Sequence, residues 1–61
     1  MSAKRKVKDA LSAVEDALRA LQRASATVPN EPNISRAIRE LRDAETLLQR
    51  AAREVSRLES Q

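Results

Sequence analysis

Cysteine, histidine, glycine and all three aromatic residue types are missing from this chain of 61 residues. Without cysteine there is no disulfide or thiolate site, and without histidine the commonest metal ligand is absent. The lack of glycine excludes a glycine-rich phosphate loop, and the general bases and nucleophiles that histidine, cysteine and tyrosine supply are missing as well. We therefore expect a protein that is not an enzyme and that binds no cofactor, metal ion or small-molecule substrate.

Helix breakers and long apolar runs are also scarce. Proline occurs only at Pro29 and Pro32. No apolar run approaches the roughly 20 residues that cross a bilayer. The rest of the chain is rich in alanine, leucine, arginine and glutamate, which favour helix. We expect a small all-α protein that is cytoplasmic and has no membrane partner.

The two prolines divide the chain near its middle, and the sequence predicts one domain over residues 1–61. We expect a first helix over about 3–27, a turn over about 28–33 and a second helix over about 34–59. Ser2 is the predicted N-cap of the first helix, because its hydroxyl oxygen can accept a hydrogen bond from a free amide in the first turn.

The start of the second helix is less sharply marked. Glu31 precedes a proline and is therefore disfavoured in the helical region, so Pro32 is expected in the first turn or just before it. Asn30 and Asn33 are alternative N-caps, and the start is predicted between Glu31 and Ile34.

Both predicted helices repeat a seven-residue pattern in which a large apolar residue is followed, three positions later, by alanine in most cases. We call these heptad positions a and d. Position a holds Val7, Val14, Leu21, Val28, Ile34, Leu41, Leu48 and Val55. Position d holds Ala10, Ala17, Ala24, Ala37, Ala44, Ala51 and Leu58. Positions b, c and f are mostly charged or polar, as on a solvated face.

The register of the two repeats predicts how the chain folds back. In an antiparallel hairpin, residues at one level have numbers with a constant sum, and the four pairs of large a residues all sum to 62. We therefore expect an antiparallel two-helix hairpin joined along positions a and d. Alanine layers would allow an interaxial distance near the short end of the usual range of about 8–10 Å.

The apolar stripe extends over positions g, a, d and e, which is wider than one neighbouring helix covers. We expect four apolar residues, together with Glu45, to form an oligomer interface: Leu11, Leu18, Ile38 and Leu47. They would face water in a single hairpin, so the favoured state is a homodimeric four-helix bundle. An amphipathic helix of another protein is the alternative partner. Glu45 either pairs with an arginine of the partner or keeps its carboxylate in water at the edge of the stripe.

Charge is unevenly distributed along the chain. Lysine and arginine number 12 and aspartate and glutamate 9, and the whole excess of +3 lies in residues 1–30. Four bases near the N-terminus form a candidate polyanion-binding cluster: Lys4, Arg5, Lys6 and Lys8. Such a cluster favours phosphate contacts. The alternative interpretation is that the fold neutralises this cluster with Glu54 and Glu59 from the end of the second helix.

Arginines of the second helix alternate with acidic residues four positions further on, a spacing that favours ion pairs on a solvated face. The pairs expected from this spacing are Arg36–Glu40, Arg39–Asp43 and Arg50–Glu54.

A helical hairpin of this length, with alternating large and alanine layers and a short central turn, resembles the Rop family. That resemblance implies an antiparallel dimeric four-helix bundle that binds paired RNA hairpins. The RNA face of the family is implied to include a phenylalanine, which this chain lacks, so we carry over no binding residue. We expect a self-associating protein–protein interaction module that serves as adaptor, regulator or small chaperone. The alternative is a Rop-like dimer that binds nucleic acid through its basic N-terminus.

Overall fold

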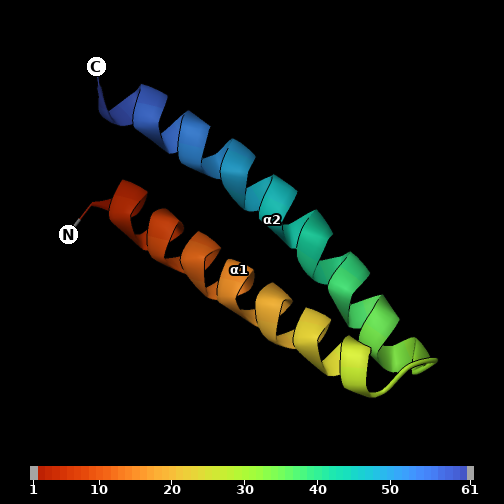
Figure 1. Ribbon diagram of the computed structural model, residues 1–61. Helices are drawn as coiled ribbons and strands as arrows, with labels where there is room; N and C mark the ends of the chain where they lie inside the picture. Colours follow the sequence, from red (N-terminus) through yellow and green to blue (C-terminus); the bar gives the residue numbers. More distant parts are fainter. Residues whose placement is uncertain (1, 61) are drawn as a thin grey trace.

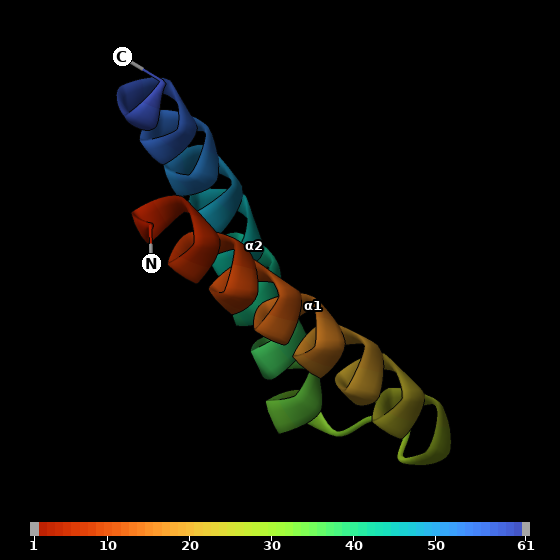
Figure 2. The same cartoon turned by 90° about the vertical axis from the view of Figure 1, so that its left-hand side faces the viewer.

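The computed structural model describes residues 2–60 as two antiparallel helices joined by a short turn (Figure 1). Helix α1 spans Ala3–Thr27 and helix α2 spans Pro32–Glu59. The helices pack against each other, and their ribbons cross at a shallow angle when seen from the side (Figure 2). The Cα trace measures 48 × 17 × 11 Å. The predicted all-α two-helix hairpin is confirmed over these residues.

Helix α1 begins where the sequence predicts a cap. Ser2 has an extended backbone, and its Oγ accepts a hydrogen bond from the backbone N–H of Arg5 at 3.2 Å. Its carbonyl oxygen accepts a second bond from the N–H of Lys6 at 3.3 Å. The prediction of Ser2 as N-cap is confirmed.

Helix α1 ends at Thr27 because the next residue, Val28, precedes a proline and leaves the helical region, with φ −127° and ψ 76°. The N–H of Val28 still bonds the carbonyl oxygen of Ala24 at 2.9 Å. Val28 is 51% exposed. Val28 thus lies in the turn, within the predicted range of about 28–33, and it is more exposed than the predicted outermost layer of Val28 and Ile34 requires.

The turn reverses the chain at Asn30, whose φ of 65° lies in the left-handed region that asparagine tolerates better than most residues. Helix α2 then begins at Pro32, which lies within the predicted range from Glu31 to Ile34 and two residues before the approximate bound of 34. Its cap is Glu31, whose carboxylate accepts a hydrogen bond from the N–H of Asn33 at 2.9 Å. Pro32 takes the first helical position, which needs no N–H donor. The prediction of Asn30 or Asn33 as N-cap is wrong.

Candidate interaction surface

The side chains that α1 and α2 bury against each other come chiefly from heptad positions a and e, and most alanines of position d are half-buried beside them. Leu18, at position e, is 6% exposed and is the most deeply buried of residues 2–60. The other residues of these two rows between the turn and the chain ends are half-buried. We call this set the inner face: Val7, Leu11, Val14, Leu18, Leu21 and Ser25 of α1, with Ile34, Ile38, Leu41, Glu45, Leu48, Ala52 and Val55 of α2.

The seam is shifted toward position e from the predicted one, in which positions a and d join the helices, although five of the seven d residues in the repeat are half-buried. The expectation that Leu11, Leu18 and Ile38 face water in a single hairpin is wrong, because Leu18 is buried and the other two are half-buried. The physical reason is size. Position e carries leucine and isoleucine where position d carries alanine, so turning each helix toward e removes more apolar area from water.

Leu47, at position g, does face solvent and is 62% exposed. It belongs to a second apolar stripe, made of positions d and g, which we call the outer face. The outer face comprises Ala10, Ala13, Ala17, Ala20 and Ala24 of α1, with Ala37, Ala44, Leu47, Ala51 and Leu58 of α2. Half of these residues are exposed and half are partly covered. Leu58, near the end of α2, is 54% exposed.

The outer face is continuous across both helices. At 3.6 residues per turn, positions d and g lie about 110° around the helix from positions a and e. Because both helices use the same rows for the inner face, an approximate two-fold axis perpendicular to the plane of the hairpin relates α1 to α2. Such an axis exchanges the helices without exchanging the two sides of that plane. The d and g rows of both helices therefore lie on the same side.

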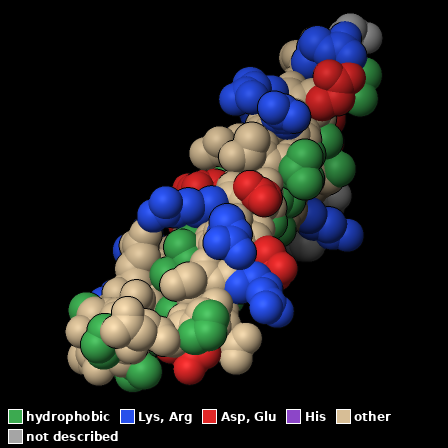
Figure 3. Space-filling view, turned by 90° about the vertical axis from the view of Figure 1, so that its right-hand side faces the viewer, with side chains coloured by type: hydrophobic (Ala, Val, Ile, Leu, Met, Phe, Trp, Pro, Cys, Tyr) green, Lys and Arg blue, Asp and Glu red, His purple; other side chains and the backbone are tan. Residues whose placement is uncertain are grey.

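Much apolar surface remains accessible on this hairpin. The accessible area is 4667 Å², which is about 700 Å² more than a compact monomer of this mass exposes. On the side drawn in Figure 3, apolar side chains reach the surface in patches along the rod, with charged groups beside them. Within residues 2–60, Leu18 is the single hydrophobic residue whose exposed fraction is as low as that of a typical core residue.

Glu45 lies at position e, on the inner face, and is half-buried. Within residues 2–60 it takes part in no ion pair. Its row points toward the other helix of its own hairpin, away from the outer face. Contact between an oligomeric partner and Leu11, Leu18, Ile38, Leu47 or Glu45 stays a prediction, and of these five only Leu47 lies on the outer face.

The basic cluster surrounds the first two turns of α1. Lys4 is half-buried, whereas Arg5, Lys6 and Lys8 are exposed. By helical position, Lys4, Arg5 and Lys8 lie on one side and Lys6 lies beside the outer face. Over the described residues, no ion pair links these bases to Glu54 or Glu59.

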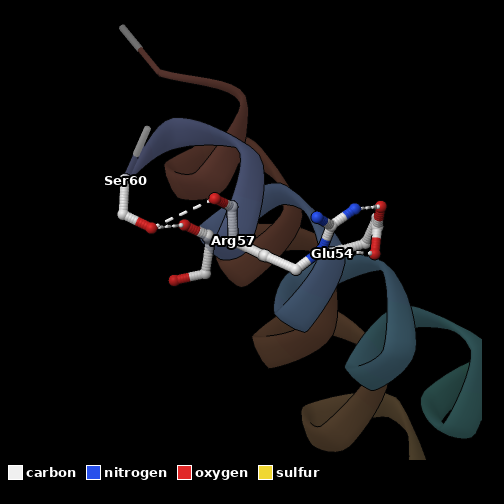
Figure 4. A network of polar contacts seen from close by, with 4 residues as sticks. Glu54, Arg57 and Ser60 are labelled. Carbon is white, nitrogen blue, oxygen red and sulfur yellow. Dashed lines mark hydrogen bonds and ion pairs between the residues drawn. The ribbon is translucent and has the colours of Figure 1, made fainter.

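The two ion pairs that the structure shows within residues 2–60 are Asp16–Arg19 and Glu54–Arg57, both at a spacing of three. Figure 4 shows the second pair, together with the hydroxyl of Ser60, which donates hydrogen bonds to carbonyl oxygens in the last turn of α2. In both pairs the acid precedes the base, the orientation that suits the helix dipole.

The three predicted pairs at a spacing of four are wrong, since none of them forms among the described residues. Each of them would place arginine before the acid, which is the weaker orientation. All four charged side chains in the observed pairs are more than half exposed, so each pair contributes little to stability.

Other kinds of site are absent from the described part of the chain. Residues 2–60 form no pocket and no group of three or more acidic side chains arranged to hold a metal ion. Neither α1 nor α2 combines the length and the apolar character that a bilayer span requires.

Comparison of this chain with protein-family models, with curated proteins and with solved structures finds no match. The resemblance to the Rop family therefore rests on the layout of the helices alone. The residues that the sequence missed as interface candidates are Ala10, Ala13, Ala20 and Leu58. Their exposure could have been predicted from the larger side chains at position e. When these side chains pack between the helices, each helix turns position d toward the outer face.

Proposed function

We propose that this chain is a non-enzymatic interaction module of the cytoplasm, which self-associates through its outer face into an antiparallel four-helix bundle. It acts by protein–protein contact, as an adaptor, regulator or small chaperone. The observation that supports this most directly is Leu47, a leucine that is 62% exposed in the middle of a continuous apolar face.

Energetics support the same proposal. Relative to an extended chain, the hairpin buries only about half of its surface, and small domains need about 60% even for marginal stability. The usual supplements for a small fold are disulfides, metal ions and oligomerisation. The chain has neither cysteine nor histidine, so burial of the outer face against another helix pair is the supplement that its residues favour.

Sedimentation equilibrium from low micromolar to millimolar concentration tests this proposal, with far-UV circular dichroism recorded on the same samples. We expect the mass of two chains and a loss of helicity on dilution below the dissociation constant. A chain that stays monomeric and fully helical throughout this range would overturn the proposal. A chain that remains monomeric and unfolded would overturn it as well.

A second candidate function is binding of nucleic acid by the basic cluster, in the manner of a Rop-like dimer. It is favoured by the finding that Glu54 pairs with Arg57 and leaves the bases of α1 without an acidic partner from α2 among the described residues. Titration with RNA and DNA hairpins at increasing salt tests it. Binding is expected to weaken steeply with salt and to disappear when Lys4, Arg5, Lys6 and Lys8 are all replaced by alanine.

A further inference from the structure

Positive charge is concentrated on the side of the hairpin that lies opposite the outer face. Heptad positions b and f lie about 100° around each helix from the inner face, on the side away from positions d and g. The two-fold relation that puts both outer stripes on one side of the hairpin therefore puts the b and f rows of both helices on the other side. We call this side the basic flank. Its charged residues are Arg5, Lys8, Glu15 and Arg19 of α1, with Arg39, Arg42 and Arg53 of α2.

The basic flank carries more positive charge than the whole chain. Six bases and one acid give it a net charge of +5, whereas the whole chain carries +3. Positions d and g of both helices hold one base, Lys6, and two acids, Glu40 and Glu54. All six bases of the flank are exposed, and within residues 2–60 only Arg19 among them forms an ion pair. Most of the positive charge on this side therefore has no acidic partner among the described residues.

The six bases form two groups, each drawn from both helices. Helix α1 ends at Thr27 and α2 begins at Pro32, so residues whose numbers add up to about 60 lie at one level of the rod. The group near the chain ends consists of Arg5, Lys8 and Arg53. The group near the turn consists of Arg19, Arg39 and Arg42. At 1.5 Å per residue, the two groups are about 20 Å apart along the rod.

Acidic and neutral side chains separate the two groups. Glu15 and Glu45 share a level between them, and both are half-buried. Neither forms an ion pair within residues 2–60. The neutral residues of the b and f rows in this middle part are Ser12, Thr46 and Gln49. Lys4 and Glu59, which lie in the e rows beside the end group, offset each other in charge. A partner that fits this pattern carries negative charge at two places about 20 Å apart and little between them.

The two backbones of a double-stranded nucleic acid present this pattern. The major groove of B-form DNA is about 12 Å wide between the surfaces of its backbones, so phosphorus atoms across it are about 18 Å apart. The long side chains of the two groups can reach one backbone each, and guanidinium groups suit bidentate phosphate contacts. The carboxylates of Glu15 and Glu45 would then lie over the groove, away from both backbones. A-form RNA offers a similar pair of backbones across its wide minor groove.

Other polyanions match the basic flank less well. Proteins commonly hold a single nucleic-acid strand by stacking its bases on aromatic side chains, and this chain has none. An anionic membrane presents negative charge without a gap, so it would face Glu15 and Glu45 as well as the bases. The b and f rows also hold no large apolar side chain that could enter a bilayer. Charge and composition therefore favour a duplex.

We infer that the basic flank of each hairpin binds the two phosphate backbones of a double-stranded nucleic acid across a wide groove. The end group contacts one backbone and the turn group contacts the other. This inference rests on the second candidate function, the binding of nucleic acid, and moves the site from the basic cluster of α1 to a face built by both helices. The outer face stays free for the proposed self-association, because it lies on the opposite side of the hairpin.

Fluorescence anisotropy at increasing salt tests this inference with three labelled probes: a DNA duplex, an RNA duplex and a single DNA strand. Duplexes of about 20 base pairs span about 68 Å, which exceeds the 48 Å length of the rod. We expect at least one duplex to bind about tenfold more tightly than the single strand. Its dissociation constant should rise about a thousandfold between about 50 and 200 mM salt, as for six phosphate contacts. The duplex that binds more tightly identifies DNA or RNA as the partner.

Paired substitutions separate the basic flank from the overall charge. Lys8→Gln with Arg42→Gln removes one base from each group, and we expect the dissociation constant for the duplex to rise about ten- to a hundredfold. Lys6→Gln with Arg36→Gln is the matched control, because it removes the same charges at exposed positions outside the b and f rows. The control should bind within about threefold of the unchanged chain. Circular dichroism of both variants checks that the helices are retained.

Single substitutions show whether both groups bind one duplex. Lys8→Gln and Arg42→Gln are each expected to lower the slope of the salt dependence by about one. A loss confined to Lys8→Gln would overturn the inference and leave the basic cluster of α1 as the site. Equal losses in the paired variant and its control would overturn it too, because binding would then follow net charge alone.

The choice of partner can fail separately from the site. Single-strand binding as tight as duplex binding would overturn the duplex as partner. Binding to vesicles with about 30% phosphatidylserine, without binding to either duplex, would overturn it in favour of a membrane surface. The absence of binding to all three nucleic-acid probes at about 50 mM salt would overturn both the inference and the second candidate function.

Discussion

Leu18 and Leu47 are identical side chains in helices of similar composition, yet one is 6% exposed and the other 62%. Leu18 lies on the inner face, where branched residues of α1 and α2 meet. Leu47 lies on the outer face, where its neighbours are alanines. The difference shows that the single hairpin covers one side of the apolar stripe and leaves the other side in contact with solvent.

The two faces also differ in what they contribute. The inner face holds the larger side chains and determines whether the hairpin forms, because burial of apolar area is its main source of stability. The outer face holds small side chains that let another helix approach closely, with one central leucine to fill the remaining space. The proposed division is folding through the inner face and association through the outer face.

The largest effect is expected from Leu18→Ala, which acts on folding through the inner face. Loss of a buried leucine from the inner face should lower the free energy of unfolding by about 2–5 kcal/mol per chain, because a cavity remains where the side chain was. Urea unfolding followed by circular dichroism measures it. Val28→Ala is the matched control at a turn residue that is 51% exposed, and an equal loss there would contradict the assignment of the inner face.

Leu47→Gln is expected to act on association. Glutamine keeps helix propensity close to that of leucine but gives up apolar burial, so dimerisation should weaken by about 1.5–3 kcal/mol per chain. Sedimentation equilibrium measures the change in dissociation constant. Thr46→Gln, at the exposed neighbouring position, should leave the dissociation constant unchanged. An equal effect of both substitutions would remove the distinction between the outer face and the solvated surface.

Ala13→Leu should leave folding through the inner face unchanged and weaken association through the outer face. Ala13 is exposed in the single hairpin and both residues favour helix, so the hairpin tolerates the change. In the dimer the added methyl groups would lie between the two outer faces and cost about 1–3 kcal/mol in association through overpacking. Measurement of helicity and of the dissociation constant on the same samples distinguishes these effects. Tighter association of this variant would show that the outer seam has unfilled space.

The smallest effect is expected from Glu45→Leu, which makes the inner face more uniform. Glu45 is half-buried and forms no ion pair within residues 2–60, so leucine should gain about 1 kcal/mol of stability from added apolar burial. Thermal unfolding measures this gain. If Glu45 instead pairs with an arginine of the partner, the same substitution would loosen the dimer, and a raised dissociation constant would reveal that role.

The sequence by itself determined the helices, the break between them and one of the caps. A seven-residue repeat of large residues and alanines has the period of a packed helix, and no other secondary structure fits it. Pro29 and Pro32 stop a continuous helix because the residue before each proline avoids the helical region. Ser2 was predictable as a cap because the capping bond is made within four residues of the chain.

Only the tertiary structure decided how far each helix turns about its own axis. The apolar positions g, d, a and e together cover about 160° of the helix, so several seams within that arc satisfy the same pattern. The choice of a and e follows from how two surfaces fill space together, which favours Leu18 over Ala17 between the helices. Glu31 caps α2 for a local reason, because Asn30 takes the left-handed conformation of the turn and Pro32 occupies the first helical position. Periodicity is a property of one helix, whereas the seam and the face left open are properties of the pair.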